Sequence, residues 1–285
     1  MAQNARDIRR RIRSVKSTEQ ITKAMEMVAA AKLRRAQERV HLARPYARKM
    51  EEVIGSIAKA GDVRHPMMVK RPVRKSGYVV ITADRGLAGA YNANIIRVTL
   101  EAIRGKAKNE YTIIAVGRRG RDFFKKRDFP VAEEITGLSD YPTYADIKRV
   151  AGAAVKMYEE EVYDELFLVY NQFINPVQQT PVVKKILPLE DVGGEAEGHR
   201  LHYEYEPSAE AVLETLLPKY AETLIFSALL DAKASEHGAR MTAMGNASDN
   251  AAEMIDTLTL ALNRARQAAI TLQISEIVGG AEALK

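Results

Sequence analysis

The chain has 285 residues, of which 46% are hydrophobic and 6% aromatic, with no Trp and no Cys. The lack of Cys excludes disulfides, zinc–thiolate clusters and thiol nucleophiles from its chemistry. The formal net charge of +6 is uneven, because residues 1–50 hold fourteen Lys or Arg against four acids. A basic segment of this kind attracts nucleic acid, anionic lipid or an acidic protein surface, and composition does not choose among them.

The apolar stretches are too short for a membrane span, which needs about twenty residues. The first residues are rich in Arg and poor in acids, like a mitochondrial transit peptide. The helical period described next runs through them without a break, so we interpret them as part of the mature protein.

The first predicted element is a long helix over residues 1–60. From Ile8 to Ile57, positions spaced alternately four and three apart are apolar at twelve of fifteen places. This heptad pattern is typical of a left-handed coiled coil. Pro45 is expected to kink or loosen the helix, and Gly61 and Pro66 mark its end.

The exceptions in this seam lie together. They are Glu19, Thr22 and Glu26, and the apolar residues move beside them to a neighbouring face. Either the helix touches something other than its partner here, or the seam is locally polar. The displaced apolar residues are Ile21, Met25 and Val28.

A second long helix is predicted over residues 208–285, although Pro218 interrupts it soon after its start. At about 1.5 Å per residue the two helices are roughly 80 and 100 Å long, more than a small domain can bury. Since each has one apolar stripe, we predict that they pack antiparallel as a two-helix coiled coil. The second seam consists of Ile255, Leu258, Leu262, Ala265, Ala269 and Leu272.

Residues 74–206, between the helices, alternate short β-rich runs with helical stretches, which predicts a Rossmann-like α/β domain with a parallel sheet. The fold class is therefore α/β with a coiled coil of the two chain ends. Strands are expected at 77–83, 111–116, 165–170, 180–187 and 199–206, and helices at 92–104, 118–126 and 144–160.

The loop over residues 82–90 is the best candidate for ligand chemistry, because it follows the first strand. Gly86 and Gly89 match neither the dinucleotide fingerprint nor a P-loop, so we favour a structural turn. His199 and His202 are expected on opposite faces of a strand, and Ser235 and His237 should diverge on a helix. The sequence thus predicts no catalytic residue, metal site or cofactor.

Five segments, in order along nearly the whole chain, resemble F-type ATP synthase gamma subunits, most closely bacterial ones. The resemblance implies a central rotor shaft in one copy per complex, inside a ring of three alpha and three beta subunits, beside an epsilon subunit. It also implies a peripheral place on the cytoplasmic side of the cell membrane, with membrane contact only through the c-ring. The segments are 21–29 (ITKAMEMVA), 84–89 (DRGLAG), 235–244 (SEHGARMTAM), 263–271 (NRARQAAIT) and 276–281 (EIVGGA).

The resemblance also implies how the shaft meets its ring. The basic stripe of the first helix would face acidic loops of the beta subunits, with the apolar patch at residues 21–28 at the contact. This chain has Leu272 where many relatives have Gln or Lys. The residues implied in the rotor–stator contact are Lys23, Met25, Arg240, Arg266 and Gln267.

Two other classes of protein remain as alternatives. A basic coiled-coil adaptor that binds nucleic acid would suit the isoelectric point of about 9.3. A nucleotide-binding enzyme would use the α/β domain. Neither accounts for the five segments, and the resemblance implies a subunit without an active site of its own.

Overall fold

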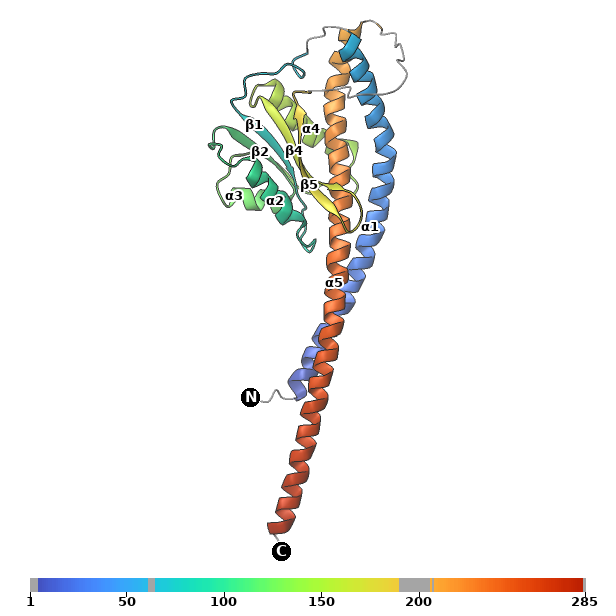
Figure 1. Cartoon of the computed structure of the whole chain (residues 1–285), viewed down its shortest axis with the longest axis vertical. Coiled ribbons are helices and arrows are strands. Elements are labelled where there is room, and N and C mark those ends of the chain that lie inside the picture. The colour runs from blue at the N-terminus through green and yellow to red at the C-terminus, as the bar shows by residue number, and fades with distance from the viewer. Residues whose placement is uncertain (1–4, 61–64, 190–205, 207, 284–285) are drawn as a thin grey trace. The chain divides into compact units, whose positions relative to one another are not determined.

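A computed structural model describes the chain except residues 1–4, 61–64, 190–205, 207 and 284–285 (Figure 1). The contacts group it into two compact units, which cut across the three predicted segments. One unit comprises residues 1–28 and 241–285, and the other comprises residues 29–240. The strand predicted at 199–206 lies almost wholly outside the described residues.

Two helices, α1 (Ala5–Ala60) and α5 (Ala209–Ala283), confirm the long helical ends of the chain. Pro45 lies inside α1 and Pro218 inside α5, so the expectation that Pro218 interrupts the second helix is wrong. An internal proline costs a helix about 3 kcal/mol. Around Pro218 this cost is offset by burial of the neighbouring side chains Leu217 and Ala221, both 0% exposed.

In the unit of residues 1–28 and 241–285, α1 and α5 run antiparallel. The hydroxyls of Thr22 and Ser248 lie 2.7 Å apart, and Gly245 faces the carboxylate of Glu26. The polar seam positions of α1 are therefore buried or half-buried with the apolar ones. The second of the two alternatives for this stretch is confirmed, because the seam keeps its register and is locally polar.

In the unit of residues 29–240, the seam of α1 continues with the same period. Its nine positions from Ala29 to Ile57 are all buried or half-buried, and Ile54 and Ile57 are 0% exposed. The α5 partner contributes Leu213, Leu217 and other members of the same apolar cluster. The heptad prediction thus holds along the whole of α1.

The α/β part of this unit is a five-stranded sheet in the order β3-β2-β1-β4-β5. Four strands are parallel, as predicted, but β5 pairs antiparallel with β4. The strand β3 was not predicted, because the middle of its sequence VAEEI is exposed and holds two glutamates. The strands are β1 (Ser76–Ile81), β2 (Tyr111–Val116), β3 (Val131–Ile135), β4 (Glu165–Phe173) and β5 (Gln179–Leu187).

Helices cover both faces of the sheet (Figure 1). Alternate residues of β1 and β2 point into two separate apolar clusters, as the period of two in a strand requires. One cluster holds side chains of α2 (Tyr91–Ala102) and α3 (Arg118–Lys125), and the other holds α4 (Tyr144–Glu159) and α5. The long helix α5 is therefore itself a covering layer of the sheet.

Candidate functional site

The crevice at the carboxyl ends of the strands is the first place to look for chemistry, because open α/β sheets bind ligands there. The strand order reverses between β1 and β4. Beside this point β1 ends at Ile81 and runs into the loop over residues 82–90, as the sequence suggested.

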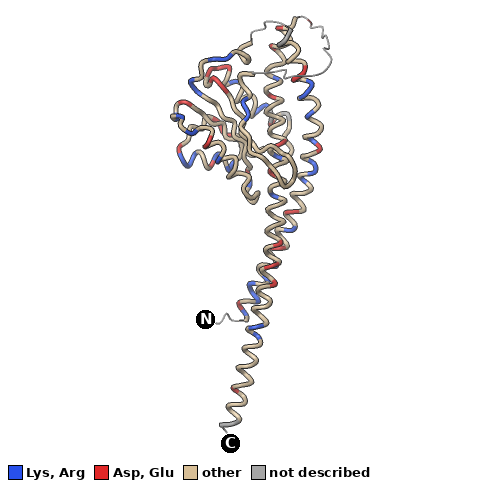
Figure 2. Tube along the Cα trace, viewed as in Figure 1, with Lys and Arg blue, Asp and Glu red and all other residues tan. Residues whose placement is uncertain are grey.

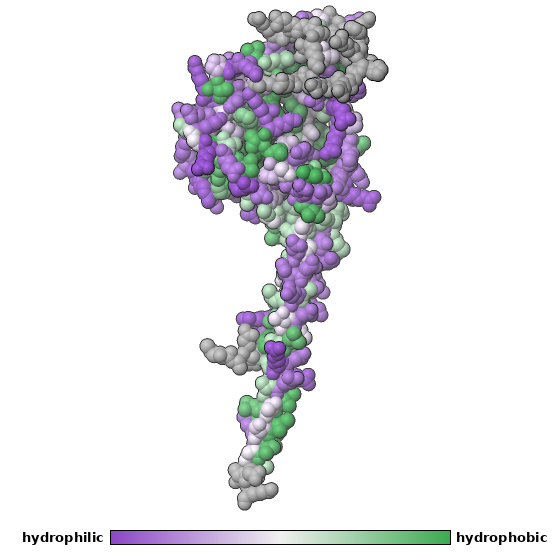
Figure 3. Space-filling model, in the orientation of Figure 1, coloured by the Kyte–Doolittle hydropathy of each residue, from purple (hydrophilic) through white to green (hydrophobic). Residues whose placement is uncertain are grey.

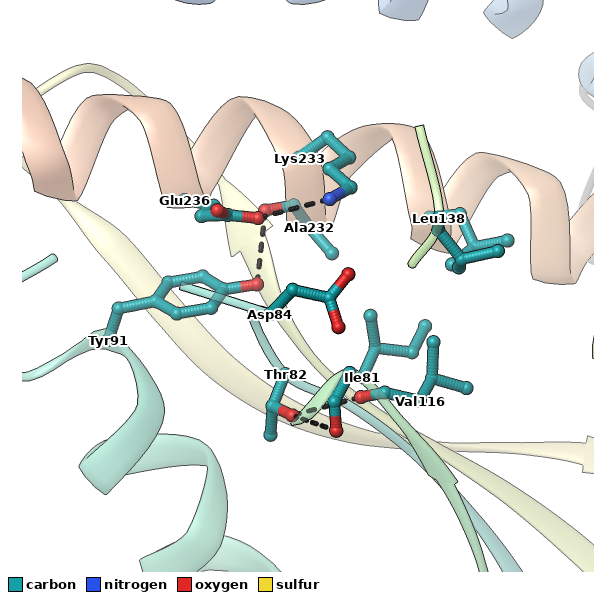
Figure 4. Close-up of a pocket in the computed structure, with 11 residues that line it drawn as sticks. Ile81, Thr82, Asp84, Tyr91, Val116, Leu138, Ala232, Lys233 and Glu236 are labelled. Atoms are coloured by element: carbon teal, nitrogen blue, oxygen red, sulfur yellow. Dashed lines mark hydrogen bonds and ion pairs between the residues drawn. The ribbon is translucent and has the colours of Figure 1, made fainter. Parts of the chain in front are cut away.

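In this protein the crevice is filled by α5. A small hollow remains between the sheet ends and the helix, and Figure 4 shows Lys233 and Glu236 of α5 above Tyr91 and Thr82. Its free space is about 10 Å³, enough for one water molecule. A small-molecule site needs several hundred cubic ångströms, so the hollow has no room for a nucleotide.

The loop over residues 82–90 packs as a structural turn. The Asp84 carboxylate accepts hydrogen bonds from the backbone N–H groups of Arg118 and Gly137, both at 3.0 Å. The Thr82 hydroxyl accepts from the Gly120 N–H at 2.8 Å. A Cβ at Gly86 would lie 2.5 Å from the Arg119 guanidinium. This contact is with the end of a flexible side chain, so the stronger sign of a structural turn is Gly89, whose φ of +52° favours glycine.

Gly117 is needed at the end of β2 for a reason that the sequence did not reveal. Its φ is +90°, and a Cβ there would lie 2.1 Å from the Thr82 carbonyl oxygen. Only glycine fits a backbone position with both properties. Close packing of the two strand ends therefore replaces the wide crevice of a nucleotide-binding fold.

A charged cluster on α5 borders the hollow. The Glu236 carboxylate lies 2.8 Å from the Arg240 guanidinium and 3.3 Å from the Lys233 ammonium. Burial alone would raise the pKa of Glu236, but Lys233 and Arg240 outweigh it and hold the pKa below its ordinary value. Arg240 also donates to the Gly86 carbonyl at 3.3 Å, so the cluster ties α5 to the loop.

His237 belongs to the same region but cannot serve as a general base for a bound substrate. Its side chain is 1% exposed, and burial lowers its pKa to about 4 although Glu236 and Asp140 oppose the shift. Its Nε2 lies 3.9 Å from Asp140. The Asp140 carboxylate forms an ion pair with the Lys32 ammonium of α1 at 2.6 Å. The Ser235 hydroxyl instead donates to the Asn171 carbonyl, so Ser235 and His237 diverge as predicted.

Among the residues that the structure describes, no group of three His, Asp or Glu side chains could hold a metal ion. The two histidines predicted on a strand, His199 and His202, lie outside the described residues. Within the described ranges no helix is both long and apolar enough to cross a membrane.

Four of the five expected contact residues lie on helix surfaces. Lys23 is exposed and pairs with Glu26 at 3.0 Å, Met25 is half-buried, and Arg266 and Gln267 are exposed. Three apolar residues near them on α1 are open to solvent. They are Ile21, Met27 and Val28, with exposed fractions of 58%, 61% and 55%.

Arg240 is placed differently from the other four. Its side chain is 12% exposed and is engaged by Glu236 and Gly86 of the same unit. This burial could not be predicted from sequence, because an arginine is expected to face solvent.

The end of α5 is unpaired. From Arg266 to Ala281 all residues are exposed, Ala269 and Leu272 of the predicted seam among them. Glu276 is the one charged residue between Gln267 and Ala281. This stretch is therefore almost entirely tan in Figure 2 and largely green in Figure 3. An unshielded apolar helix end is typical of a surface that another protein covers. Its exposed large residues are Ile270, Leu272, Ile274, Ile277 and Val278.

The sequence analysis missed Tyr91 and Asn171, which connect the sheet to α5. The Tyr91 hydroxyl donates to the Ala232 carbonyl at 3.1 Å (Figure 4), and the Asn171 side-chain amide donates to the Tyr91 carbonyl. A polar residue inside an otherwise apolar strand, as Asn171 is in ELFLVYNQF, is the signal that could have found them.

These features define a class of protein in which an α/β domain packs against a long helix where related folds bind a nucleotide, and the end of that helix is exposed and apolar. Comparison with known proteins agrees. The family model described as ATP synthase matches residues 4–284. The ATP synthase gamma chain of Brevibacillus brevis is 60% identical over 287 residues, 99% of both chains. The chain therefore belongs to the ATP synthase gamma-chain family.

Solved structures agree in fold. A chain from the central stalk and c-ring of the Tetrahymena thermophila mitochondrial ATP synthase is 26% identical, with a TM-score of 0.60, covering 80% of this chain and 99% of that one. A chain of the Euglena gracilis mitochondrial enzyme is 21% identical, with a TM-score of 0.73, covering 98% and 94%. The comparisons give no support to the alternative of a nucleic-acid-binding adaptor.

Proposed function

We propose that this chain is the central rotor shaft of an F-type ATP synthase, which couples rotation of a proton-driven c-ring to ATP synthesis in the beta subunits. The observation that carries the proposal is the 60% identity to a gamma chain along 99% of both chains. The unpaired apolar end of α5 supports it, because a bearing surface gains from apolar contact that has no preferred direction.

The partners follow from this role. The helices of residues 1–28 and 241–283 insert into a ring of three alpha and three beta subunits, and the α/β domain meets the epsilon subunit and the c-ring. One copy serves each complex. The complex lies on the cytoplasmic side of the cell membrane, and this chain contacts the membrane only through the c-ring.

The rotor–stator contact comprises Lys23 and Met25 on α1 and Arg266 and Gln267 on α5. Exposed positive charge on α1 supports it, since acidic loops of the ring are attracted to such a surface. Arg240 joins the contact by exchange of partners, in which an acidic side chain of the ring replaces Glu236.

The chain has no active site of its own and binds no cofactor. The filled crevice supports this, together with the buried, neutral His237 and the engaged Ser235. A nucleotide-binding enzyme would need space that α5 occupies.

The test is reconstitution with purified alpha and beta subunits. The chain should copurify with a 3:3 ring as one copy, and a bead attached to it should turn when ATP is added. The isolated chain should hydrolyse no ATP. A chain that stays outside the ring, or hydrolyses ATP alone, would overturn the proposal.

A further inference from the structure

Three buried hydrogen bonds form a closed circuit between the sheet and α5. The Tyr91 hydroxyl of α2 donates to the Ala232 carbonyl of α5 at 3.1 Å, and the Asn171 side-chain amide of β4 donates to the Tyr91 carbonyl at 3.2 Å. The Ser235 hydroxyl of α5 donates to the Asn171 carbonyl at 2.9 Å and closes the circuit. Tyr91, Asn171 and Ser235 are 4%, 2% and 0% exposed.

The circuit adds directional interactions, which the apolar contact between α5 and the sheet lacks. Apolar side chains such as Ile225 and Leu229 are fully or almost fully buried in it, and this contact resists separation. It has little directional preference, so it resists sliding and turning less. Hydrogen bonds weaken steeply when their angle or length changes. A turn of α5 about its own axis would strain the bonds at Ala232 and Ser235 together.

The circuit lies at the contact between the α/β domain and α5, where torque would pass from one to the other. On the proposed function, which this inference rests on, the α/β domain is driven by the membrane ring and α5 drives the catalytic ring. The load then passes through the contact between the α/β domain and α5. All three donors lie in the unit of residues 29–240, so the circuit belongs to one compact body.

We infer that Tyr91, Asn171 and Ser235 are positioning residues that stiffen the joint between the α/β domain and α5 against twist. They touch no substrate. They act by keeping the angle of the helix fixed to the angle of the domain, so that rotation of one becomes rotation of the other without slack.

The test measures twist directly in the assembled complex. The chain has no Cys, so Lys108→Cys, at an exposed position between α2 and β2, provides a single attachment point for a bead on the α/β domain. The catalytic ring is fixed to a surface and stalled without ATP. The angular fluctuation of the bead then reports the stiffness of the path from the domain to the ring.

The variant is Tyr91→Phe with Ser235→Ala, which removes two of the three bonds with little change of volume. Its angular variance should be at least twice that of the parent. Tyr163→Phe is the matched control, because its buried hydroxyl donates to the Ala154 carbonyl within the α/β domain, and its variance should equal that of the parent.

The same variants are tested in vesicles with the whole ATP synthase. The double variant should hydrolyse ATP within twofold of the parent rate but pump fewer protons per ATP against an opposing gradient. Unchanged variance in the double variant would overturn the inference, as would a parallel fall of hydrolysis and pumping with unchanged variance. Failure of the proposed function would look different, because the parent chain itself would then not turn with ATP.

Discussion

Replacement of Asp231 by Asn should stabilise the chain at neutral and alkaline pH. Asp231 of α5 is 8% exposed, and its Oδ1 has no hydrogen-bond partner. Burial raises its pKa to about 6, although Arg44 of α1 and Lys184 of β5 oppose the shift. Tyr170 of β4 shares this environment, and Asp231 helps burial to raise the pKa of Tyr170 to about 12.

The magnitude follows from the pKa. The ordinary value is 3.8, and at 1.36 kcal/mol per pKa unit the difference corresponds to about 3 kcal/mol. Because the folded-state pKa is raised, the contribution of the protonated carboxyl is fully present below pH 3.8 and is lost as the pH rises through 6. Asn has nearly the same shape and does not ionise, so it escapes this loss.

Urea unfolding of the isolated chain, followed by its helical circular dichroism, measures the effect. Asp231→Asn should raise the free energy of unfolding by about 3 kcal/mol at pH 8 and leave it unchanged near pH 3.5. Asp249→Asn, at an exposed position on the same helix, is the control and should change little at either pH. An equal gain at both pH values, or none at pH 8, would refute the reasoning.

Three further predictions concern the helices. Met25→Lys places a cation at the proposed acidic contact, so the complex should assemble but ATP-driven proton pumping should fall, by about tenfold for each 1.4 kcal/mol added to the rotation barrier; unchanged pumping would contradict this. Deletion of residues 279–285 should leave the ATPase rate nearly intact and speed dissociation of the complex. Arg266→Ala with Gln267→Ala should lower the ATPase rate more. The reverse pattern would show that the end of α5, and not Arg266 and Gln267, makes the coupling contact. Gly245→Ala should raise the free energy of unfolding by about 0.5–1 kcal/mol, because its Cβ would lie 3.5 Å from the Glu26 carboxyl carbon, an ordinary contact; a loss of stability in urea would show that the seam is tighter there.

The long helices could be predicted from sequence because the heptad period is local and repeats many times. Even Glu19 and Glu26, which break the apolar pattern, are half-buried at their seam positions. Strands β1, β2 and β4 were also predictable, because each is a nearly continuous apolar run buried on both faces.

The rest depends on where distant segments meet. Nothing local to β5 shows that it pairs antiparallel with β4, since strand direction depends on the connection. The filling of the crevice by Ala232 and Lys233 likewise depends on the path of α5 across the sheet. Arg240 shows the same limit, because its burial beside Glu236 and Gly86 follows from that path and not from its neighbours in sequence.

The hydroxyl pair of Thr22 and Ser248 distinguishes one register of the two helices from the others. A heptad seam is periodic, so its apolar contacts alone would be nearly as favourable after a slip of seven residues. After such a slip Ser248 would face Val15 or Ala29, and Thr22 would face Met241 or Ile255. Neither hydroxyl would then find the other. Thr22 would keep the Thr18 and Glu19 carbonyls of its own helix, at 3.1 and 3.0 Å, so the slip costs the interhelical bond itself, about 1 kcal/mol. The pair thus fixes the register of the two helices, because the observed register is lower in free energy than those shifted by seven residues.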